Sequence, residues 1–315
     1  MQCSLCGGPA FYRRNFEGVD LCKRCFKKSI ENKVRSTISK YKMLGPEDKI
    51  AVAVSGGKDS LALLWIMRKL KSRFPLSKIF AVTIDEGIRN YRDEALSLAR
   101  SLSERINIEH RVFSFKEFFK VTLDDIVQKK RETSRVTPCS YCGVLRRRAL
   151  EIAARNIGAN KIATAHNLDD EVQTALLNII HGGVDRLLRS GPYLRDPQGR
   201  FIPRIKPLSE IYEREVALYA YIVGLDFQIT PCPYRSEALR GEVRNIINML
   251  EENHPGIKYT VYSSKLRLSR LLDNQIFNMQ TCKSCGYPTS GEIGEVCKII
   301  GDTNSRRYVS FEKLN

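Results

Sequence analysis

Short apolar runs alternate with amphipathic stretches through the first half of the chain. Residues 49–54, 77–84 and 108–113 are apolar runs of the length and composition that predict strands buried on both faces of a sheet. Residues 61–67 and 90–106 lie between these runs and carry apolar side chains at helical spacing. Strands and helices that alternate at these lengths indicate right-handed βαβ units. The pattern therefore predicts an α/β fold with a doubly wound parallel sheet.

The rest of the chain continues this alternation and then becomes helical. A basic helix is predicted before the first strand, at residues 28–44, where Gly45-Pro46 ends it. The later elements are predicted as a strand at residues 161–165 and helices at residues 117–135, 143–156, 209–223, 236–252 and 257–273. A Gly- and Pro-rich segment between them is expected to be a basic surface loop, whose cationic residues are Arg186, Arg189, Arg195, Arg200, Arg204 and Lys206.

A glycine-containing turn joins the first strand to the helix that follows it. The turn reads Ser55-Gly56-Gly57-Lys58-Asp59-Ser60. Adjacent glycines let the backbone curl so that its N–H groups point at an anion, and the N-terminus of the helix adds a favourable dipole. The spacing differs from the common P-loop, because the glycines are adjacent and Asp59 precedes the serine. We predict a phosphate site in which Lys58 meets phosphate charge and Asp59 orients Mg2+ or its waters.

The charge of the chain points to a polyanionic partner. Lys and Arg number 52 against 35 acidic residues, a net charge of +17 over 315 residues. A small nucleotide alone does not require such an excess, so nucleic acid is the expected partner and an anionic membrane surface is the alternative. No apolar run approaches the ~20 residues of a membrane-spanning helix, and no signal peptide opens the chain. We therefore expect a cytoplasmic protein with no membrane segment.

Ten cysteines in a reducing compartment are more typical of metal sites than of disulfides. Four of them form two C-x-x-C knuckles near the N-terminus, Cys3/Cys6 and Cys22/Cys25. Four thiolates complete a tetrahedral shell, which is typical of a structural Zn2+ site with no open position. Residues 1–30 are therefore predicted to form a zinc ribbon.

A second cysteine group near the other end of the chain has one ligand fewer. Cys282-x-x-Cys285 is followed by Cys297 alone, and Gly294 stands where a second knuckle would place a cysteine. The predicted second Zn2+ site therefore offers three thiolates, and it requires a fourth ligand or stays weakly metallated. This site belongs to a predicted C-terminal zinc-finger-like module, which follows the main domain and a helical segment. The predicted bounds are residues 31–235 for the main domain, 236–276 for the helical segment and 277–315 for the module.

The remaining three cysteines, Cys139, Cys142 and Cys232, lie inside the main domain and are flanked by prolines. A cubane iron–sulfur cluster normally takes four thiolates, so three would leave one iron open to a small ligand such as hydrosulfide or a persulfide. Two other readings are open: Cys139 and Cys142 form a redox pair, or one cysteine carries a persulfide that Cys232 resolves. A purely structural role is the remaining interpretation.

The carboxyl ends of three predicted strands mark a candidate crevice, because ligands of doubly wound sheets collect there. The turn after residue 54, the strand end near Ile84 and the turn after Ala165 should converge on it. The last turn contains His166 and Asp170, which predicts an acid/base or Mg2+ cluster or, alternatively, an acidic turn favoured by the helix dipole. Arg146 begins an arginine triplet, which would bind the phosphate of a nucleotide or of RNA or form a solvated helix face.

Together these features resemble the tRNA 2-thiouridine synthetases of the TtuA and cytoplasmic wobble-thiolation type, a branch of the PP-loop ATPases with an adenine-nucleotide alpha-hydrolase-like fold. The resemblance covers almost the whole chain. The motifs that carry it are the four-cysteine ribbon, Ser55–Ser60, Asp85-Glu86-Gly87, Pro138–Arg148, Thr164–Glu171, Thr230–Tyr234 and Cys282–Thr289. The chain departs from this family at Gly294, where relatives have a second C-x-x-C.

The resemblance implies a reaction and the residues that perform it. In that family ATP adenylates the 2-oxygen of a tRNA uridine, sulfur replaces AMP, and three cysteines hold a [4Fe-4S] cluster whose free iron carries the incoming sulfur. By matching motif, the cluster ligands would be Cys139, Cys142 and Cys232, which are the expected catalytic residues together with Asp59, Arg146 and Asp170. The nucleotide contacts carried over in the same way are Ala53, Ser55, Gly56, Gly57, Lys58, Asp59, Ser60, Ile84, Arg146 and Ala165.

The resemblance also implies partners. These are tRNA, a sulfur donor that is either a ubiquitin-like carrier with a thiocarboxylated C-terminal glycine or inorganic sulfide, and a second copy of the chain in a homodimer. The T-loop 5-methyluridine at position 54 is the expected target, and the wobble uridine at position 34 is the alternative. Two other functions stay open. The charge of +17 argues against an amidating PP-loop synthase that acts on a small molecule, and a non-catalytic zinc-ribbon RNA-binding protein leaves the Ser55–Ser60 turn unexplained.

Overall fold

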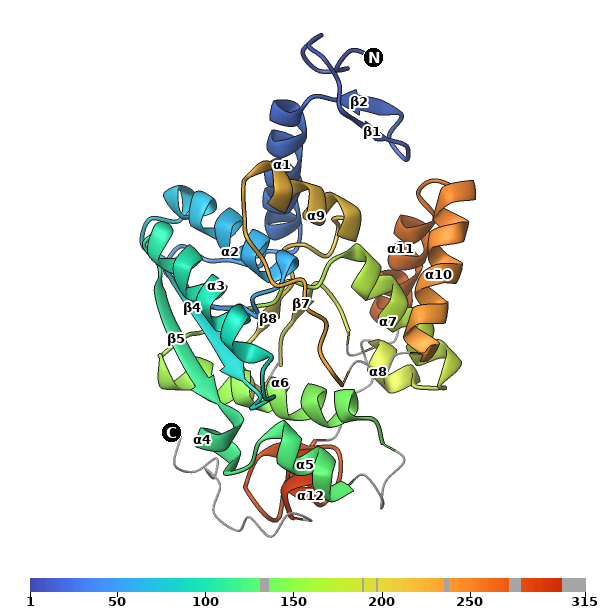
Figure 1. The fold of residues 1–315 in the computed structure, drawn as a ribbon. Coiled ribbons are helices and arrows are strands. Elements are labelled where there is room, and N and C mark those ends of the chain that lie inside the picture. Colours follow the sequence, from blue (N-terminus) through green and yellow to red (C-terminus); the bar gives the residue numbers. More distant parts are fainter. Residues whose placement is uncertain (131–135, 189, 197, 235–237, 272–278, 302–315) are drawn as a thin grey trace.

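A computed structural model of the chain describes residues 1–130, 136–188, 190–196, 198–234, 238–271 and 279–301. Its centre is a six-stranded sheet in the order β5-β4-β3-β6-β8-β7 (Figure 1). The strands are β3 (Lys49–Ala53), β4 (Lys78–Asp85), β5 (Glu109–Ser114), β6 (Lys161–Ala163), β7 (Tyr193–Leu194) and β8 (Arg204–Ile205). Only β7 runs antiparallel to its neighbour. The predicted α/β fold with a central parallel sheet is confirmed.

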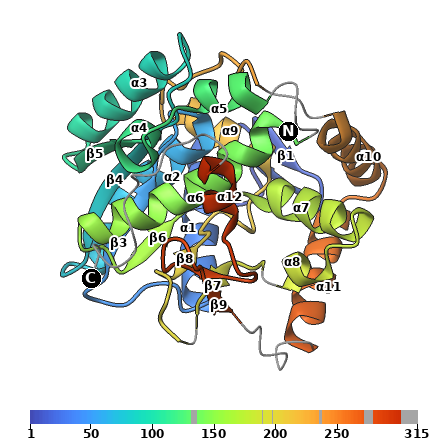
Figure 2. The ribbon, with the colours of Figure 1, turned by 90° about the horizontal axis from the view of Figure 1, so that it is seen from below.

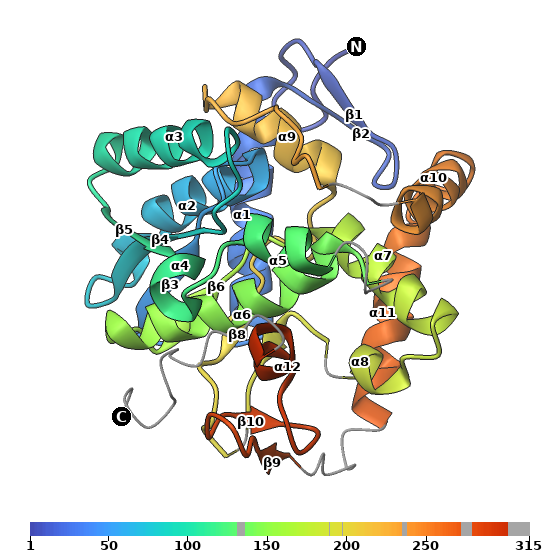
Figure 3. The ribbon, with the colours of Figure 1, turned by 60° about the horizontal axis from the view of Figure 1, so that its bottom comes forward.

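Side chains that alternate along the strands divide the core into two layers. Ile50 and Val52 of β3 pack into one hydrophobic cluster, whereas Ala51 between them packs into another. The first cluster is covered by α1 (Lys23–Lys40), α2 (Lys58–Leu70), α3 (Arg92–Arg105) and α9 (Glu213–Ile222). The second is covered by α4 (Phe115–Phe119), α5 (Leu123–Lys130) and α6 (Pro138–Asn156). Figure 3 shows these two groups of helices above and below the sheet.

A third group of helices packs beside the sheet. It comprises α7 (Leu168–Ile180), α8 (Val184–Leu188), α10 (Ala238–Asn253) and α11 (Ile257–Leu271). Leu168, Ile247 and Tyr262 form its apolar centre. The carboxylate of Glu171 on α7 is buried between two cations, with Lys206 Nζ and Lys265 Nζ each 2.6 Å away. These charges hold α7 to α11 and to the end of β8.

Small modules lie at opposite ends of the molecule (Figure 1). The N-terminal module contains β1 (Tyr12–Arg14), β2 (Val19–Leu21) and the start of α1, and the C-terminal one contains β9 (Gln280–Thr281), β10 (Pro288–Thr289) and α12 (Glu295–Gly301). Seen from below, α12 lies against α6 (Figure 2), where Ile299 and Ile300 join the second core cluster. Among the helices described, none has the length and apolarity needed to cross a membrane.

Two predicted elements differ from those observed near the cysteine motif. Helix α6 begins at Pro138, so Cys139 and Cys142 lie in its first turn and not in a loop that precedes a helix at residue 143. Proline is favoured at the first helical position, because its N–H has no partner there and its φ is already helical. The helix predicted at residues 117–135 is interrupted, since Lys120 at φ +60 ends α4 before α5 begins. Residues 131–135 lie outside the described part of the chain.

The segment that was expected to be a basic surface loop is partly buried structure. It includes the short helix α8 and the paired strands β7 and β8. Lys206 is 9% exposed because it neutralises Glu171, and Arg200 binds Asp196. Arg189 and the predicted helix ends at residues 236 and 273 lie outside the described residues. The periodicity therefore predicted the longer helices and missed the short helix α8 and two short strands, since elements this short carry too little pattern to recognise.

Candidate functional site

The turn after β3 depends on a glycine with an unusual conformation. Gly56 has φ +84, and a Cβ atom at this position would lie 2.6 Å from the Cα and Cβ atoms of Ala95. Ser55 N donates to Ser60 Oγ over 3.1 Å, and Ser60 Oγ donates to Gly57 O over 2.9 Å. These bonds fix the turn just before α2 begins at Lys58. Backbone N–H groups at the start of a 13-residue helix form a site for phosphate.

The turn lies at the point where the strand order of the sheet reverses. Strands β4 and β5 extend from β3 in one direction, and β6 and β8 extend in the other. A crevice at the carboxyl ends of the strands is expected at such a point. Ala53, Ile84 and Ala165 lie at or just beyond the ends of β3, β4 and β6. Asn167 Nδ2 donates to Asp59 Oδ1 over 3.3 Å, which joins the turn after β6 to the turn after β3.

Lys58 is held by two carboxylates at this edge of the sheet. Its Nζ lies 2.9 Å from Asp59 Oδ2 and 2.8 Å from Glu213 Oε1. Glu213 is the first residue of α9, and its backbone N–H donates to Asp169 Oδ2 over 2.7 Å. No sequence pattern marks Glu213, because only the tertiary fold brings α9 to the turn. A phosphate that binds Lys58 would compete with Asp59 and Glu213 for its ammonium group.

Asp170 lies beside the same group but has a different electrostatic setting. Its side chain accepts from Asn167 N and caps the start of α7 together with Asn167. Burial raises the pKa of Asp170 to about 6, and the nearby charges of Asp59 and Glu213 act in the same direction. Asp170 therefore caps a helix, as one of the two interpretations of this acidic turn predicts, and the charges of Asp59 and Glu213 also act on it. His166 is exposed and contacts Thr164 Oγ1 through Nδ1 over 2.9 Å.

A buried glutamate connects the turn with the central cysteines. Glu86, which follows β4 and is 3% exposed, forms ion pairs of 2.9 Å with Arg92 Nε and Arg146 Nε. Arg92 also donates to the carbonyl oxygens of Ser55 and Ile84, over 3.3 and 2.9 Å. Arg146 NH2 lies 2.9 Å from Cys142 Sγ. A continuous series of contacts thus runs from the turn through Arg92, Glu86 and Arg146 to Cys142.

The arginine triplet is divided among three environments. Arg146 faces this site with 47% of its side chain exposed. Arg147 offers its carbonyl oxygen to Arg204 NH2 over 3.0 Å. The guanidinium of Arg148 lies over the ring of Tyr287, 3.1 Å from its centroid. Of the three, Arg146 is joined to Glu86 and to Cys142.

The three central cysteines gather around the start of α6. Cys139 Sγ donates to Tyr234 O over 3.2 Å, which brings the segment of Cys232 against the helix. Burial raises the pKa of Cys142 to about 11, although Arg146 opposes this shift. Burial also raises the pKa of Cys232, and the charge of Cys139 acts in the same direction. A thiol with a raised pKa stays protonated at neutral pH unless a metal ion binds its thiolate and displaces the proton.

These donors fit an iron–sulfur cluster chemically. Thiolates are the usual ligands of such clusters. The positive end of the 19-residue helix α6 and the guanidinium of Arg146 both favour negative charge at this position. These three cysteines lie near the start of α6, but, unlike the two terminal cysteine groups, they do not all bring their sulfur atoms within 4.8 Å of one another.

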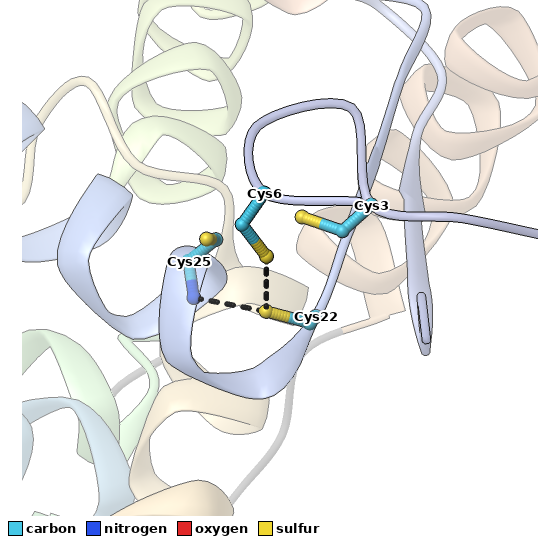
Figure 4. A group of neighbouring side chains, drawn as sticks. All are labelled: Cys3, Cys6, Cys22 and Cys25. Carbon is cyan, nitrogen blue, oxygen red and sulfur yellow. Dashed lines mark hydrogen bonds between the residues drawn. The ribbon is translucent and has the colours of Figure 1, made fainter. Parts of the chain in front are cut away.

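The cysteines of the N-terminal module converge as ligands do (Figure 4). The sulfur atoms of Cys3, Cys6, Cys22 and Cys25 all lie within 4.8 Å of one another. Cys25 N donates to Cys22 Sγ over 3.4 Å, and the backbone N–H of Cys22 lowers the pKa of Cys3. Four thiols at this spacing suit tetrahedral Zn2+.

The cysteines of the C-terminal module also converge, with one donor fewer. The sulfur atoms of Cys282, Cys285 and Cys297 lie within 4.8 Å of one another. Gly294 N donates to Cys282 Sγ over 3.3 Å, so the residue that replaces the fourth cysteine lies directly beside the group.

Comparison with known proteins agrees with this architecture. The family model described as a PP-loop domain matches residues 26–250. The tRNA 2-thiolation protein NcsA of Haloferax volcanii is 37% identical over 317 residues, which cover 95% of this chain and 98% of that protein. The tRNA-5-methyluridine(54) 2-sulfurtransferase of Pyrococcus horikoshii is 35% identical, with 96% of this chain and 94% of that protein covered.

A solved structure extends the likeness to three dimensions. The U34-tRNA thiolase NcsA from Methanococcus maripaludis, with its [4Fe-4S] cluster, superposes with a TM-score of 0.86 and 35% identity, and the match covers 98% of both chains. The fold and the turn after β3 thus define a PP-loop protein. Within that class, the chain belongs to the family of tRNA 2-thiolation proteins, which are sulfur-transferring enzymes.

Proposed function

We propose that this protein is an ATP-dependent tRNA 2-sulfurtransferase. ATP adenylates the 2-oxygen of a tRNA uridine with release of pyrophosphate, and sulfur then replaces AMP. The observation that supports the proposal is the series of contacts from Ser55 through Arg92, Glu86 and Arg146 to Cys142, because it connects the turn after β3 with one of the central thiols.

The residues of the turn would bind and orient the nucleotide. N–H groups at the start of α2 and the ammonium of Lys58 would hold the phosphates, and the backbone at Gly56 permits close approach. A carbonyl oxygen is a poor leaving group, so its attachment to AMP makes its departure easier. Asp59 is suited to orient Mg2+ or its waters, and Asp170 is suited to act as the catalytic carboxylate.

The thiols at the start of α6 would hold the sulfur-handling group. Cys139, Cys142 and Cys232 are the proposed ligands of a [4Fe-4S] cluster, which, when bound, supplies an open iron position for an incoming sulfur. Arg146 would bind phosphate at the border between the nucleotide and the thiols. The four N-terminal cysteines would hold a structural Zn2+, which orders the ribbon at the start of α1.

The target and the partners follow from the relatives and the charge. The wobble uridine at position 34 is the favoured target, because the solved relative matched over 98% of both chains is a U34-tRNA thiolase. The 5-methyluridine at position 54 is the second candidate, supported by the sulfurtransferase of Pyrococcus horikoshii. A thiocarboxylated carrier or inorganic sulfide would supply the sulfur. Ten cysteines without a disulfide suit a reducing cytoplasm.

The experiment combines metal analysis with nucleoside mapping. The protein is purified without oxygen, its iron and sulfide are quantified, and tRNA is treated with ATP and sulfide. We expect about four iron atoms per chain beyond zinc, AMP and pyrophosphate as products, and a 2-thiolated uridine at a single position. Release of no AMP would contradict the proposal and favour an RNA-binding protein without catalysis.

Cysteine variants test the proposed site directly. Cys232→Ala is expected to abolish iron loading and thiolation and to leave tRNA affinity nearly unchanged. Ser140→Ala, an exposed position between the two cysteines of α6, is the matched control and should retain both. Full thiolation by the Cys232 variant would remove this residue from the mechanism.

A further inference from the structure

The C-terminal cysteine group is built like a metal site with one position left open. We propose that Cys282, Cys285 and Cys297 bind Zn2+ through three thiolates and that the fourth position, beside Gly294, takes a small exogenous thiolate such as hydrosulfide. This would make the site different in kind from the four-thiolate ribbon at the other end of the molecule. Zinc sites with three protein ligands and an exchangeable fourth position are those that perform chemistry.

The three sulfur atoms are already close together and shielded. Cys297 Sγ lies 3.3 Å from Cys285 Sγ and 3.6 Å from Cys282 Sγ. The three residues are only 2 to 8% exposed. Their grouping is set by β9, β10 and α12, and the N–H of Gly294 donates to Cys282 Sγ over 3.3 Å. An N–H donor to sulfur favours the thiolate that a metal requires.

Gly294 leaves space where a fourth sulfur would reach. A Cβ at Gly294 would lie 3.8 Å from Cys282 Sγ and 3.7 Å from the nearest atoms of Thr289, which is ordinary van der Waals contact. The φ angle of Gly294 is not positive, so its backbone also permits a side chain. Within the described part of the chain, no fourth His, Cys, Asp or Glu joins the three thiols. A side-chain Cβ at position 294 would therefore be tolerated beside Cys282 Sγ.

The charge around the group favours an anion as the fourth ligand. Zn2+ with three thiolates carries a net charge of −1. The guanidinium of Arg148, held over the ring of Tyr287, is attracted to the thiolates of Cys285 and Cys297. Because this cation offsets the existing charge, a second unit of negative charge costs less than it would in an apolar setting.

The softness of the metal selects the kind of anion. Zn2+ is borderline soft and is bound well by thiolate sulfur. On binding, the incoming thiol or hydrogen sulfide would lose one proton to solvent and displace water from Zn2+, with no change in oxidation state.

Cadmium-113 NMR of the full chain tests the proposal without ATP or tRNA. The protein is loaded with 113Cd2+ and titrated with sodium sulfide or 2-mercaptoethanol. We expect the N-terminal resonance to stay fixed as an internal reference and a second resonance to shift toward the four-sulfur range. Loss of the second resonance in Cys285→Ser or Cys297→Ser assigns it to the C-terminal group.

The matched variant closes the open position. In Gly294→Cys the second resonance should already lie near that of the N-terminal site and should no longer respond to added thiol. Wild-type protein that binds no metal at Cys282, Cys285 and Cys297 would overturn the proposal. A second resonance of the wild-type protein that does not shift on addition of sulfide or thiol would also overturn the proposal. The fourth position would then be either occupied or unable to bind sulfur.

Discussion

Gly56 combines a backbone conformation and a crowded position that exclude other residues. Its φ of +84 is costly for any residue with a side chain, and Ala95 occupies the place of a Cβ. Neighbouring Gly57 has φ −82, and a Cβ there would lie 3.6 Å from Ser55 Oγ. The two adjacent glycines therefore have different reasons to be present: Gly56 is required for folding, whereas Gly57 is not.

We expect Gly56→Ala to destabilise the protein by about 3 kcal/mol, from the strained φ and the contact with the backbone of α3. Gly57→Ala, the matched control, should cost less than about 1 kcal/mol. Chemical denaturation of both variants measures the difference. Equal losses would show that the close approach of Gly56 to α3 does not matter to stability.

At the scale of single residues, the sequence predicted the residues that belong to motifs. It did not predict the contacts that connect one motif with another part of the chain. The turn from Ser55 to Ser60 and the three cysteine groups were found because their spacing itself carries the chemistry. Glu213 was not found, because its role comes from a contact between α9 and Lys58, separated by 155 positions. Glu86 was part of a recognised motif, but its ion pairs with Arg92 and Arg146 exist only in the folded chain.

At the scale of elements, buried charge joins α7, α11 and β8. Burial disfavours the charge of Glu171, but Lys206 and Lys265 outweigh it and lower the pKa of Glu171 to about 2 from 4.5. Because this pKa is depressed in the folded state, the stabilisation is complete above about pH 5. It is lost progressively as pH falls from about 4.5 toward about 2, where folded and unfolded chains are both protonated.

We expect Glu171→Gln to lower the free energy of unfolding by about 3 kcal/mol at pH 7, since two buried ammonium groups lose their counter-charge. The difference between variant and wild type should shrink as pH falls below about 5. Glu109→Gln, which removes an exposed partner of Arg111, should change stability by less than about 0.5 kcal/mol. A difference that stays constant from pH 7 to 4 would contradict the role of the charge.

Elements with several turns or a long apolar run were predicted well, and short ones were not. Strand β4 and helix α3 lie within two residues of their predicted limits because tertiary packing follows the same periodicity as the sequence. Strand β8 has two residues and is defined by pairing with β6 and β7, so only the fold reveals it. The first turn of α6 was missed because cysteines and a proline resemble a loop.

For the whole molecule, the charge of +17 predicts salt-dependent binding of tRNA. A surface hollow beside α1 and the end of α2 is lined by Arg35, Ser36, Ser39, Lys40 and Arg73. Lys40 is paired with Glu210, so Arg35 and Arg73 are the cations best placed to bind phosphate there.

Replacing both arginines, in Arg35→Gln/Arg73→Gln, should weaken tRNA binding and reduce the slope of log K against log [salt] by about one per residue. Arg111→Gln on β5, at the far edge of the sheet, is the control and should leave the slope unchanged. Filter binding between about 50 and 200 mM KCl measures both. If Arg111→Gln changed the slope and the double variant did not, the RNA would bind elsewhere than at Arg35 and Arg73.

Helix α6 carries Cys139 in its first turn and Arg148 nine residues later, a separation of about 14 Å along its axis. Cys139 and Cys142 lie near its beginning, and the middle of the helix is fastened to the C-terminal module through the contact of Arg148 with Tyr287. A rigid helix cannot tilt at one position alone. Any distortion of the terminal module would therefore shift Cys139 and Cys142 as well, and a remote lesion would look like a defect at these thiols.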